Sequence, residues 1–462
     1  MILRCCVAAL LTFAGVLPAY AHSSARGFVL LLPTSYVILG GAFAVLMAFV
    51  AVSFLPERLF LLQHNKLSEI PARTGGTSQA LSLLSALTLG LLIYCGFNGP
   101  RDPVENLLPL SIWTLWWVII VLLHPVFGNL WSVLNPFAGI QALLRQLSGG
   151  PRQILLRYPP ALSYWPALLI FASFAWFQLV YPAPEDPALL ATVVAIYAAF
   201  TLAAVVRYGA AAWLGKGDPF AVFMTQLGAC APVDAQGRLR CPGTGLVQLP
   251  AMPISGVLFV LLTLSSISFD GFASTFLWLS AVGINPLDYP GRTALMGANT
   301  LGLAGSFLAL ASAYVLCIAL GWKWSGRSID LPLLLGRMVF SLIPISIAYH
   351  FAHYLSGTLI NLQYFVLALN DPAGNGANLL GLTGHHVTAS FQNTAPSALT
   401  IFTAQTAAII LGHILAVAVA HAIAAEYRLP RTVTLKLEAP LVGLMVIYTG
   451  FGLWLLATPS IA

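Results

Sequence analysis

Two histidines, His350 and His353, stand three residues apart in the apolar stretch SIAYHFAHYLSG (346–357). Side chains at i and i+3 share one face of a helix, so both imidazoles can reach a common ligand. His413, in a later apolar stretch, can supply a third nitrogen, and Asp270 can supply a carboxylate. Three imidazoles with a carboxylate nearby suit zinc, copper or iron. We therefore expect a divalent or transition metal ion held by His350, His353 and His413.

These four side chains fall at a similar height if each apolar stretch spans a membrane as a helix. At about 1.5 Å of rise per residue, Asp270, His350, His353 and His413 all lie roughly 20 to 25 Å from the expected inner face. His421 follows His413 along the chain and lies only about 7 Å from that face. Ionisable groups inside a membrane are costly and are usually functional, so we expect Asp270 and His353 to be catalytic.

Other roles for these groups stay open. Asp270 can be a metal ligand, a partner that orients a histidine, or a base. It can also be a structural aspartate that only pairs with a histidine. The histidines can form hydrogen bonds between helices, ligate haem axially, or relay protons without a metal.

Four residues outside the apolar stretches are further candidates. His22 would become the first residue after cleavage of a signal peptide, and its amine and imidazole together can chelate copper. His385 and His386, in GLTGHHVTAS, and Glu105 are expected to line a substrate entrance on the outer side. The alternatives are a chance histidine at a cleavage site and ordinary solvated loop residues.

The composition requires a membrane for these segments. The 462 residues are 59% hydrophobic and 7% charged, with a mean hydropathy of +0.88. Apolar runs of about 20 residues predict membrane-spanning helices, because an apolar solvent leaves backbone groups no other partners. We expect an all-α polytopic bundle of about ten spans: 34–55, 79–97, 107–127, 162–182, 187–213, 251–279, 293–322, 331–360, 397–425 and 435–457.

The first 21 residues are typical of a secretory signal peptide. Arg4 precedes a short apolar core, and AYA (19–21) fits a small-x-small cleavage site. Cleavage would leave residues 22–462 as a single multi-pass domain. An uncleaved first helix is the alternative.

The distribution of lysine and arginine predicts the orientation. Only Arg26, Arg101 and Arg292 fall in segments that would lie outside, and the remaining basic residues after the signal fall in the inner segments. We expect a bacterial inner-membrane protein with both mature termini in the periplasm. The segment 214–250 is then a cytoplasmic loop, and 361–396 is a periplasmic loop.

The net charge of +6 follows from this asymmetry, so we expect no nucleic-acid partner. No phosphate-binding loop or nucleophile elbow is present in the sequence. The tryptophans of WTLWWVII (113–120) are expected to be packing or interfacial residues. The expected partners are an apolar small-molecule substrate and membrane lipid, and a second membrane subunit is a further candidate.

Several motifs resemble bacterial integral membrane proteins that carry the label fenitrothion hydrolase. The motifs are SFDGF (268–272), GNLWSVLNPF (128–137), HFAHY (350–354) and GHILAVAVAH (412–421). The resemblance covers nearly the whole mature chain and implies hydrolysis of a phosphorothioate triester to a nitrophenol and a dialkyl thiophosphate. Carried onto this sequence, it implies a site made from Asp270, His350, His353, His413 and His421.

A metal-bound water would be a strong nucleophile for this reaction. We therefore expect a metal-dependent phosphoric triester hydrolase with its site in the outer half of the bilayer. A copper-dependent oxidative enzyme or copper-handling protein that uses His22 is one alternative. A proton- or metal-coupled transporter is the other, favoured by His421 below His413 on one segment.

Overall fold

The computed structural model describes residues 34–55, 75–148, 155–234, 237–285, 288, 291–382 and 384–458. The expected signal peptide (1–21) and His22 lie outside these residues. The described residues are helical and form no strand, apart from one isolated bridge between Val233 and Leu239. The expected all-α bundle is confirmed.

Ten segments of the described chain are long and apolar enough to cross a membrane. In chain order they are α2 (Thr34–Phe54), α4 (Gly75–Asn98), the run of α5 (Leu107–Leu110), η1 (Ser111–Ile120) and α6 (Val121–Phe127), then α9 (Trp165–Leu179), α10 (Pro187–Tyr208), α14 (Ile254–Ala273), α16 (Arg292–Trp324), the run of α17 (Leu331–Met338), η5 (Val339–Leu342) and α18 (Ile343–Asn370), then α19 (Ala395–Ala425) and α20 (Arg431–Ala457). The principal shorter helices are α7 (Trp131–Leu134), α8 (Pro136–Leu147), α11 (Ala210–Ala212), η3 (Trp213–Gly217), α12 (Pro219–Ala229), α13 (Thr244–Val247) and α15 (Phe276–Ala281).

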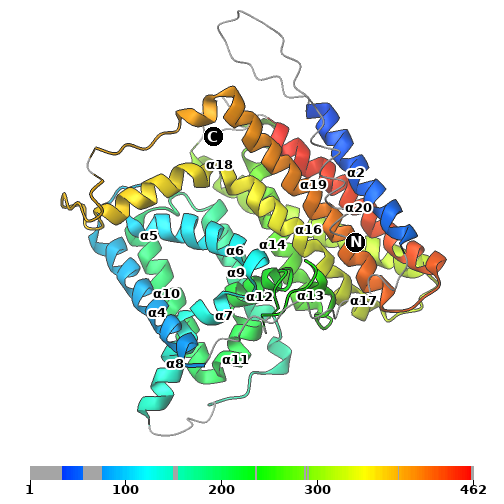
Figure 1. Cartoon of the computed structure of the whole chain (residues 1–462), viewed down its shortest axis with the longest axis horizontal. Helices are drawn as coiled ribbons and strands as arrows, with labels where there is room; N and C mark the ends of the chain where they lie inside the picture. Colours follow the sequence, from blue (N-terminus) through cyan, green and yellow to red (C-terminus); the bar gives the residue numbers. More distant parts are fainter. Residues whose placement is uncertain are drawn as a thin grey trace, which may run out of the picture. The chain divides into compact units, whose positions relative to one another are not determined.

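The core of the bundle lies around α14 and α18. In the most apolar window of each of these two spans, 72% of the residues are buried. On one side, α2, α19 and α20 pack against one another, and α16 packs against α20 (Figure 1). On the other side, α4 packs against α8 and α10. The central position of α14 and α18 places their polar side chains inside the protein.

The serine-rich helix α14 is stable in an apolar interior because its hydroxyls bond to its own backbone. Thr263, Ser265, Ser266 and Ser268 each donate to a carbonyl three or four residues earlier, over 2.8 to 3.1 Å. Such bonds satisfy hydroxyl groups that would otherwise be unpaired in a membrane. The hydroxyl groups of α14 therefore need no water molecules as hydrogen-bond partners.

Backbone contacts define the two ends of the bundle. At the first, which we name the Arg292 end, Arg292 donates to the carbonyls of Gln178 and Tyr181 over 2.8 and 3.4 Å. At the second, which we name the Arg337 end, Arg337 donates to the carbonyls of Val247 and Leu249. Helices α9 and α14 both run from the Arg337 end to the Arg292 end.

Two spans have irregular backbone next to the core. The third span contains the π-helical stretch η1, and the eighth contains the 3₁₀ stretch η5 followed by Pro344 in the first turn of α18. Proline cannot donate a backbone hydrogen bond, which explains the change of helix type at that point. A π-helical stretch displaces carbonyls from the regular pattern and is frequent at functional sites.

The segment 214–250, expected to be a loop, contains a buried helix. Nearly all side chains of α12 are buried, and Phe220 packs edge-on against Trp116 at 4.7 Å. The pair Asp218–Pro219 is an N-cap followed by proline at N1, a start signal visible in the sequence. The segment 361–396, expected to be a periplasmic loop, also differs, because α18 continues to Asn370.

Candidate active site

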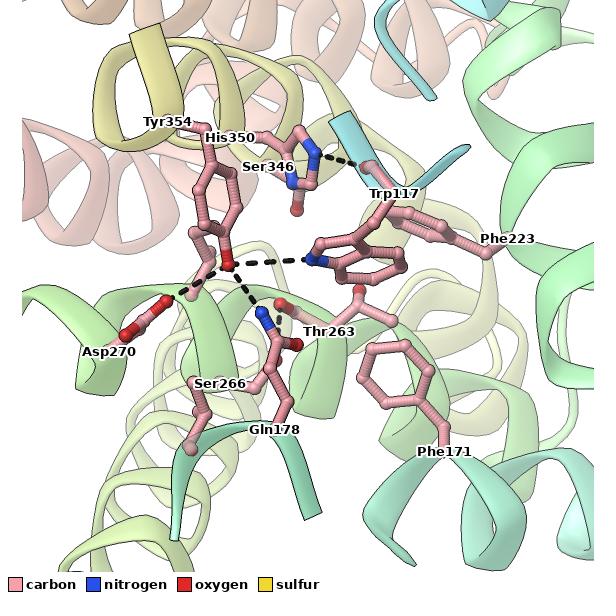
Figure 2. A pocket seen from close by; sticks show the side chains of 12 residues that line it. Trp117, Phe171, Gln178, Phe223, Thr263, Ser266, Asp270, Ser346, His350 and Tyr354 are labelled. Carbon is pink, nitrogen blue, oxygen red and sulfur yellow. Dashed lines mark hydrogen bonds between the residues drawn. The ribbon is translucent and has the colours of Figure 1, made fainter. Parts of the chain in front are cut away.

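A small polar cavity lies inside the bundle between η1, α9, α12, α14 and α18 (Figure 2). Its polar lining includes Asp270, Tyr354, Gln178 and His350, and its apolar walls include Phe171. The cavity volume is about 20 Å³, which is room for little more than one water molecule. The polar groups are therefore held by one another and not by bulk solvent.

Asp270 and His353 form the central pair. His353 Nε2 donates to Asp270 Oδ2 over 2.9 Å, and the two side chains are 30% and 25% exposed. A carboxylate that accepts from one ring nitrogen fixes the tautomer of a neutral imidazole, so the lone pair lies on the other nitrogen, Nδ1. Gly271 adds no side chain beside Nδ1, and a Cβ there would lie 3.7 Å from it. The pair can therefore accept a proton at a defined atom.

Tyr354 connects this pair to the cavity. Its hydroxyl donates to Asp270 Oδ2 over 2.9 Å and accepts from Gln178 Nε2 over 2.8 Å and from Trp117 Nε1 over 3.4 Å (Figure 2). Arg292 holds the backbone carbonyl of Gln178, which fixes the end of α9 at this point. The network restricts Asp270 to one orientation, with one oxygen shared by Tyr354 and His353.

His350 lines the same cavity but bonds elsewhere. Its Nε2 donates to the carbonyl of Trp117 in η1 over 2.8 Å, so its Nδ1 is an acceptor. The ring lies edge-on to Trp117 at 5.2 Å and to Tyr354 at 4.8 Å. The π-helical stretch thus presents a carbonyl to a histidine on another helix.

His413 does not join these residues. Its Nδ1 donates to the carbonyl of Ile409 on its own helix over 2.8 Å, and its ring packs beside Tyr349 and Tyr448. Its Nε2 is buried without a hydrogen-bond partner. Within the described ranges, no group of three or more His, Cys, Asp or Glu side chains is arranged to hold a metal ion. The side chains present therefore do not fit the expected three-histidine metal site, and a metal stays a prediction.

A second histidine–carboxylate pair lies in the bundle. His421 Nδ1 donates to both oxygens of Glu438, at 3.2 and 3.1 Å, and both residues are buried. His124 is satisfied at both ring nitrogens, by the carbonyl of Ile120 and by the backbone N–H of Trp131. His124 is therefore a structural residue that fixes the end of the third span.

The expected entrance residues lie away from the cavity lining. Glu105, His385 and His386 are exposed, and none of the three lines the cavity around Asp270. Their role at an entrance stays a prediction, as does that of His22.

Asp218 and Cys230 lie outside the spans and have shifted pKa values because they are buried. Burial raises the pKa of Asp218 to about 6, against opposing hydrogen bonds from the N–H of Phe220 and the hydroxyl of Tyr197. Burial also raises the pKa of the Cys230 thiol to about 12, so this thiol is unreactive at neutral pH.

Several residues of the site were not expected from the sequence. Tyr354 stands inside the HFAHY motif, but its role as a hydrogen-bond hub depends on contacts from other helices. Trp117 and Gln178 come from separate spans and carry no sequence signal of their own. Glu438 is an acid inside the apolar helix α20, and the cost of a carboxylate within a membrane span was the available signal.

The chain matches no protein-family model, no curated protein and no solved structure. Its function has to be argued from the side chains of the site.

Proposed function

We propose that the chain is a membrane-embedded hydrolase of apolar phosphorothioate triesters, in which His353 takes the proton of the attacking water. The observation that carries the proposal is the 2.9 Å hydrogen bond from His353 Nε2 to Asp270 Oδ2, in a pair that stays partly exposed inside an apolar bundle. This arrangement leaves Nδ1 as the base. In the serine-protease triad a carboxylate likewise orients the imidazole, but there it bonds Nδ1 and leaves Nε2 as the base. The resemblance to the fenitrothion hydrolases supplies the substrate class.

In the proposed reaction, water gives its proton to His353 Nδ1 while its oxygen attacks phosphorus. The bond between phosphorus and the aryl oxygen breaks, and its electron pair leaves on the nitrophenolate. The second product is the dialkyl thiophosphate, and His353 then returns the proton to solvent. Asp270 stabilises the imidazolium that forms. Because nitrophenolate is a good leaving group, the step needs no general acid.

The proposal puts the substrate on the exposed side of His353 and not in the cavity. A volume of about 20 Å³ is far below the roughly 300 to 1,000 Å³ of sites for drug-sized ligands. The side chain of His353 is 30% exposed, and Gly271 leaves space beside it. An apolar triester dissolves in the bilayer and can reach this surface between helices. In this proposal the residues that line the cavity hold Asp270 by hydrogen bonds and do not bind the substrate.

The experiment is hydrolysis of a fenitrothion-type ester by the full chain reconstituted in vesicles, followed by nitrophenolate release. A positioned general base contributes about 10²- to 10⁴-fold, so His353→Ala is expected to lower kcat by that factor. Lys323→Ala changes an exposed residue in the last turn of α16, outside the cavity lining, and serves as the control. Turnover by correctly inserted His353→Ala at the wild-type rate would overturn the proposal.

A second candidate is a proton-coupled transporter, and the buried pair His421–Glu438 favours it. A hydrolase of this kind has no evident use for a second histidine–carboxylate pair on α19 and α20. Flux of protons into vesicles that contain the chain separates the candidates. Glu438→Gln is expected to reduce flux in a transporter and to leave ester hydrolysis unchanged in a hydrolase.

A resident metal ion also stays open to test. With His413 bonded to its own helix, a metal at His353 or His350 would need a donor from outside the described residues, such as His22. Elemental analysis of the purified full chain decides this directly, and the mass of the mature chain shows whether it starts at His22.

A further inference from the structure

A second cavity lies at the Arg337 end, between α8 and the turn that joins α10 to α11. Its volume is about 490 Å³, and it is open on one side. Helix α8 forms one wall with Gln141 and Arg145, and the turn forms the other with Tyr208 and Gly209. This cavity has no connection to Asp270 in its lining residues, so it is a site separate from the proposed hydrolase.

The walls of this cavity are held in place by hydrogen bonds. Gln141 Nε2 donates to the carbonyl of Val205 over 2.7 Å, and its Oε1 accepts from the N–H of Ala210 over 3.1 Å. Gly209 turns the chain with a φ of +86°, a conformation that favours glycine. The ring of Tyr208 stacks on Trp213, with 6.2 Å between centroids. The cavity is therefore preformed and does not depend on a ligand.

One positively charged side chain and an apolar surface, which we call the floor, line the cavity. Arg145, in the last turn of α8, is exposed and is the only charged residue among the described residues that line the cavity. Arg207, which precedes Tyr208 in the chain, has its guanidinium 5.6 Å from the centroid of the Tyr208 ring. The floor is formed by alanines of α8 and of α11. In the part of the chain that the structure describes, no acid lines the cavity to oppose an anion.

We infer that this cavity binds the head group of an anionic phospholipid, with the phosphate on Arg145 and an acyl chain along the alanines. Arginine matches phosphate geometry by paired N–H donors, and a basic pocket between helices at the positively charged end of a membrane protein is suited to anionic head groups. A small soluble anion would gain nothing from the apolar floor. The inference does not depend on the hydrolase proposal.

The test is lipid retention by the full chain in nanodiscs of mixed phosphatidylglycerol and phosphatidylcholine, measured by native mass spectrometry after detergent release. Each basic residue near a membrane surface contributes about fivefold to anionic lipid binding. Arg145→Gln is therefore expected to lower retained phosphatidylglycerol about fivefold or more, and Arg145→Lys less. Lys323→Gln removes one exposed charge at the same end, outside the cavity, and is the matched control.

Three outcomes overturn the inference. Retention by Arg145→Gln equal to wild type excludes the site, and an equal loss in Lys323→Gln assigns binding to general surface charge. Displacement of the lipid by inorganic phosphate alone means that the cavity recognises a free anion. The elution profile of each variant in detergent is compared with that of the wild type, so that a loss of lipid is not mistaken for a loss of folding.

Discussion

The substitution Asp270→Asn tests the pair with the least change in shape. Asparagine keeps an oxygen that can accept from Tyr354, which donates to Asp270 Oδ2 over 2.9 Å in the wild type. Because Tyr354 and His353 share Oδ2 of Asp270, the amide oxygen of asparagine accepts from both, and the amide nitrogen takes the place of Oδ1. His353 then keeps its proton on Nε2, and what is lost is the negative charge that stabilises the imidazolium.

The expected loss of activity follows from this loss of charge. A hydrogen bond to a charged partner contributes about 1.5 to 3 kcal/mol, and here that energy is lost in the transition state, where the imidazolium forms. We therefore expect a loss of about 10- to 150-fold in kcat. The loss of one charge-assisted hydrogen bond costs about 1.5 to 3 kcal/mol of stability, so the variant should still fold.

The assay is nitrophenolate release in vesicles, with the amount of inserted chain measured in the same samples. Glu438→Gln makes the same carboxylate-to-amide change in the other histidine pair, and we expect it to keep at least half of the wild-type rate. An Asp270→Asn variant that retains more than a tenth of wild-type kcat would refute the reasoning. So would equal losses in Asp270→Asn and Glu438→Gln, because the effect would then come from general destabilisation.

The other predictions follow from single positions. Gly271→Val is expected to lower kcat/KM at least tenfold, because the larger side chain would cover Nδ1 of His353. Gly271→Ala places its methyl group at ordinary contact distance and should change kcat/KM less than threefold. Equal effects of the two variants would contradict the proposed access route. A membrane-impermeant maleimide should label the exposed Cys241 and leave the buried Cys230 unlabelled, and labelling of Cys241 only from the cytoplasmic side of oriented vesicles would support the predicted orientation. Burial raises the pKa of Asp218 from 3.8 to about 6, so protonation of this carboxyl favours the folded state. The stability that it contributes should be greatest below about pH 4 and fall as the pH rises to about 6. Asp218→Asn should remove this pH dependence from the melting temperature, measured by thermal unfolding.

The spans were predictable because membrane helices depend on local composition. Each stretch of about 20 apolar residues folds as a helix whichever neighbours it has, so the predicted 34–55 and 107–127 correspond closely to Thr34–Phe54 and Leu107–Phe127. The buried helix α12 was missed because its 11 residues are too short for a span. Burial of such a helix depends on partners from distant segments, and these are not visible in the local sequence.

The site was predictable only in part. Height along a helix follows from counting residues, and this correctly suggested that Asp270 and His353 could meet. The direction in which a side chain points depends on the rotation of its helix, which packing sets. His413 lies at a suitable height by the same count, but it faces Tyr349 and Tyr448. Tyr354 became the hub of the network because α9 and η1 bring Gln178 and Trp117 to it.

The most direct test of the Asp270–His353 unit is the turnover of the double variant Asp270→Asn/His353→Ala beside the two single variants. Residues that act as a unit in one chemical step show losses that do not add. We predict that the double variant is no slower than the slower single variant, within about threefold. Losses that multiply, or a wild-type chain with no activity toward the ester in any vesicle preparation, would contradict a hydrolytic site built on this pair.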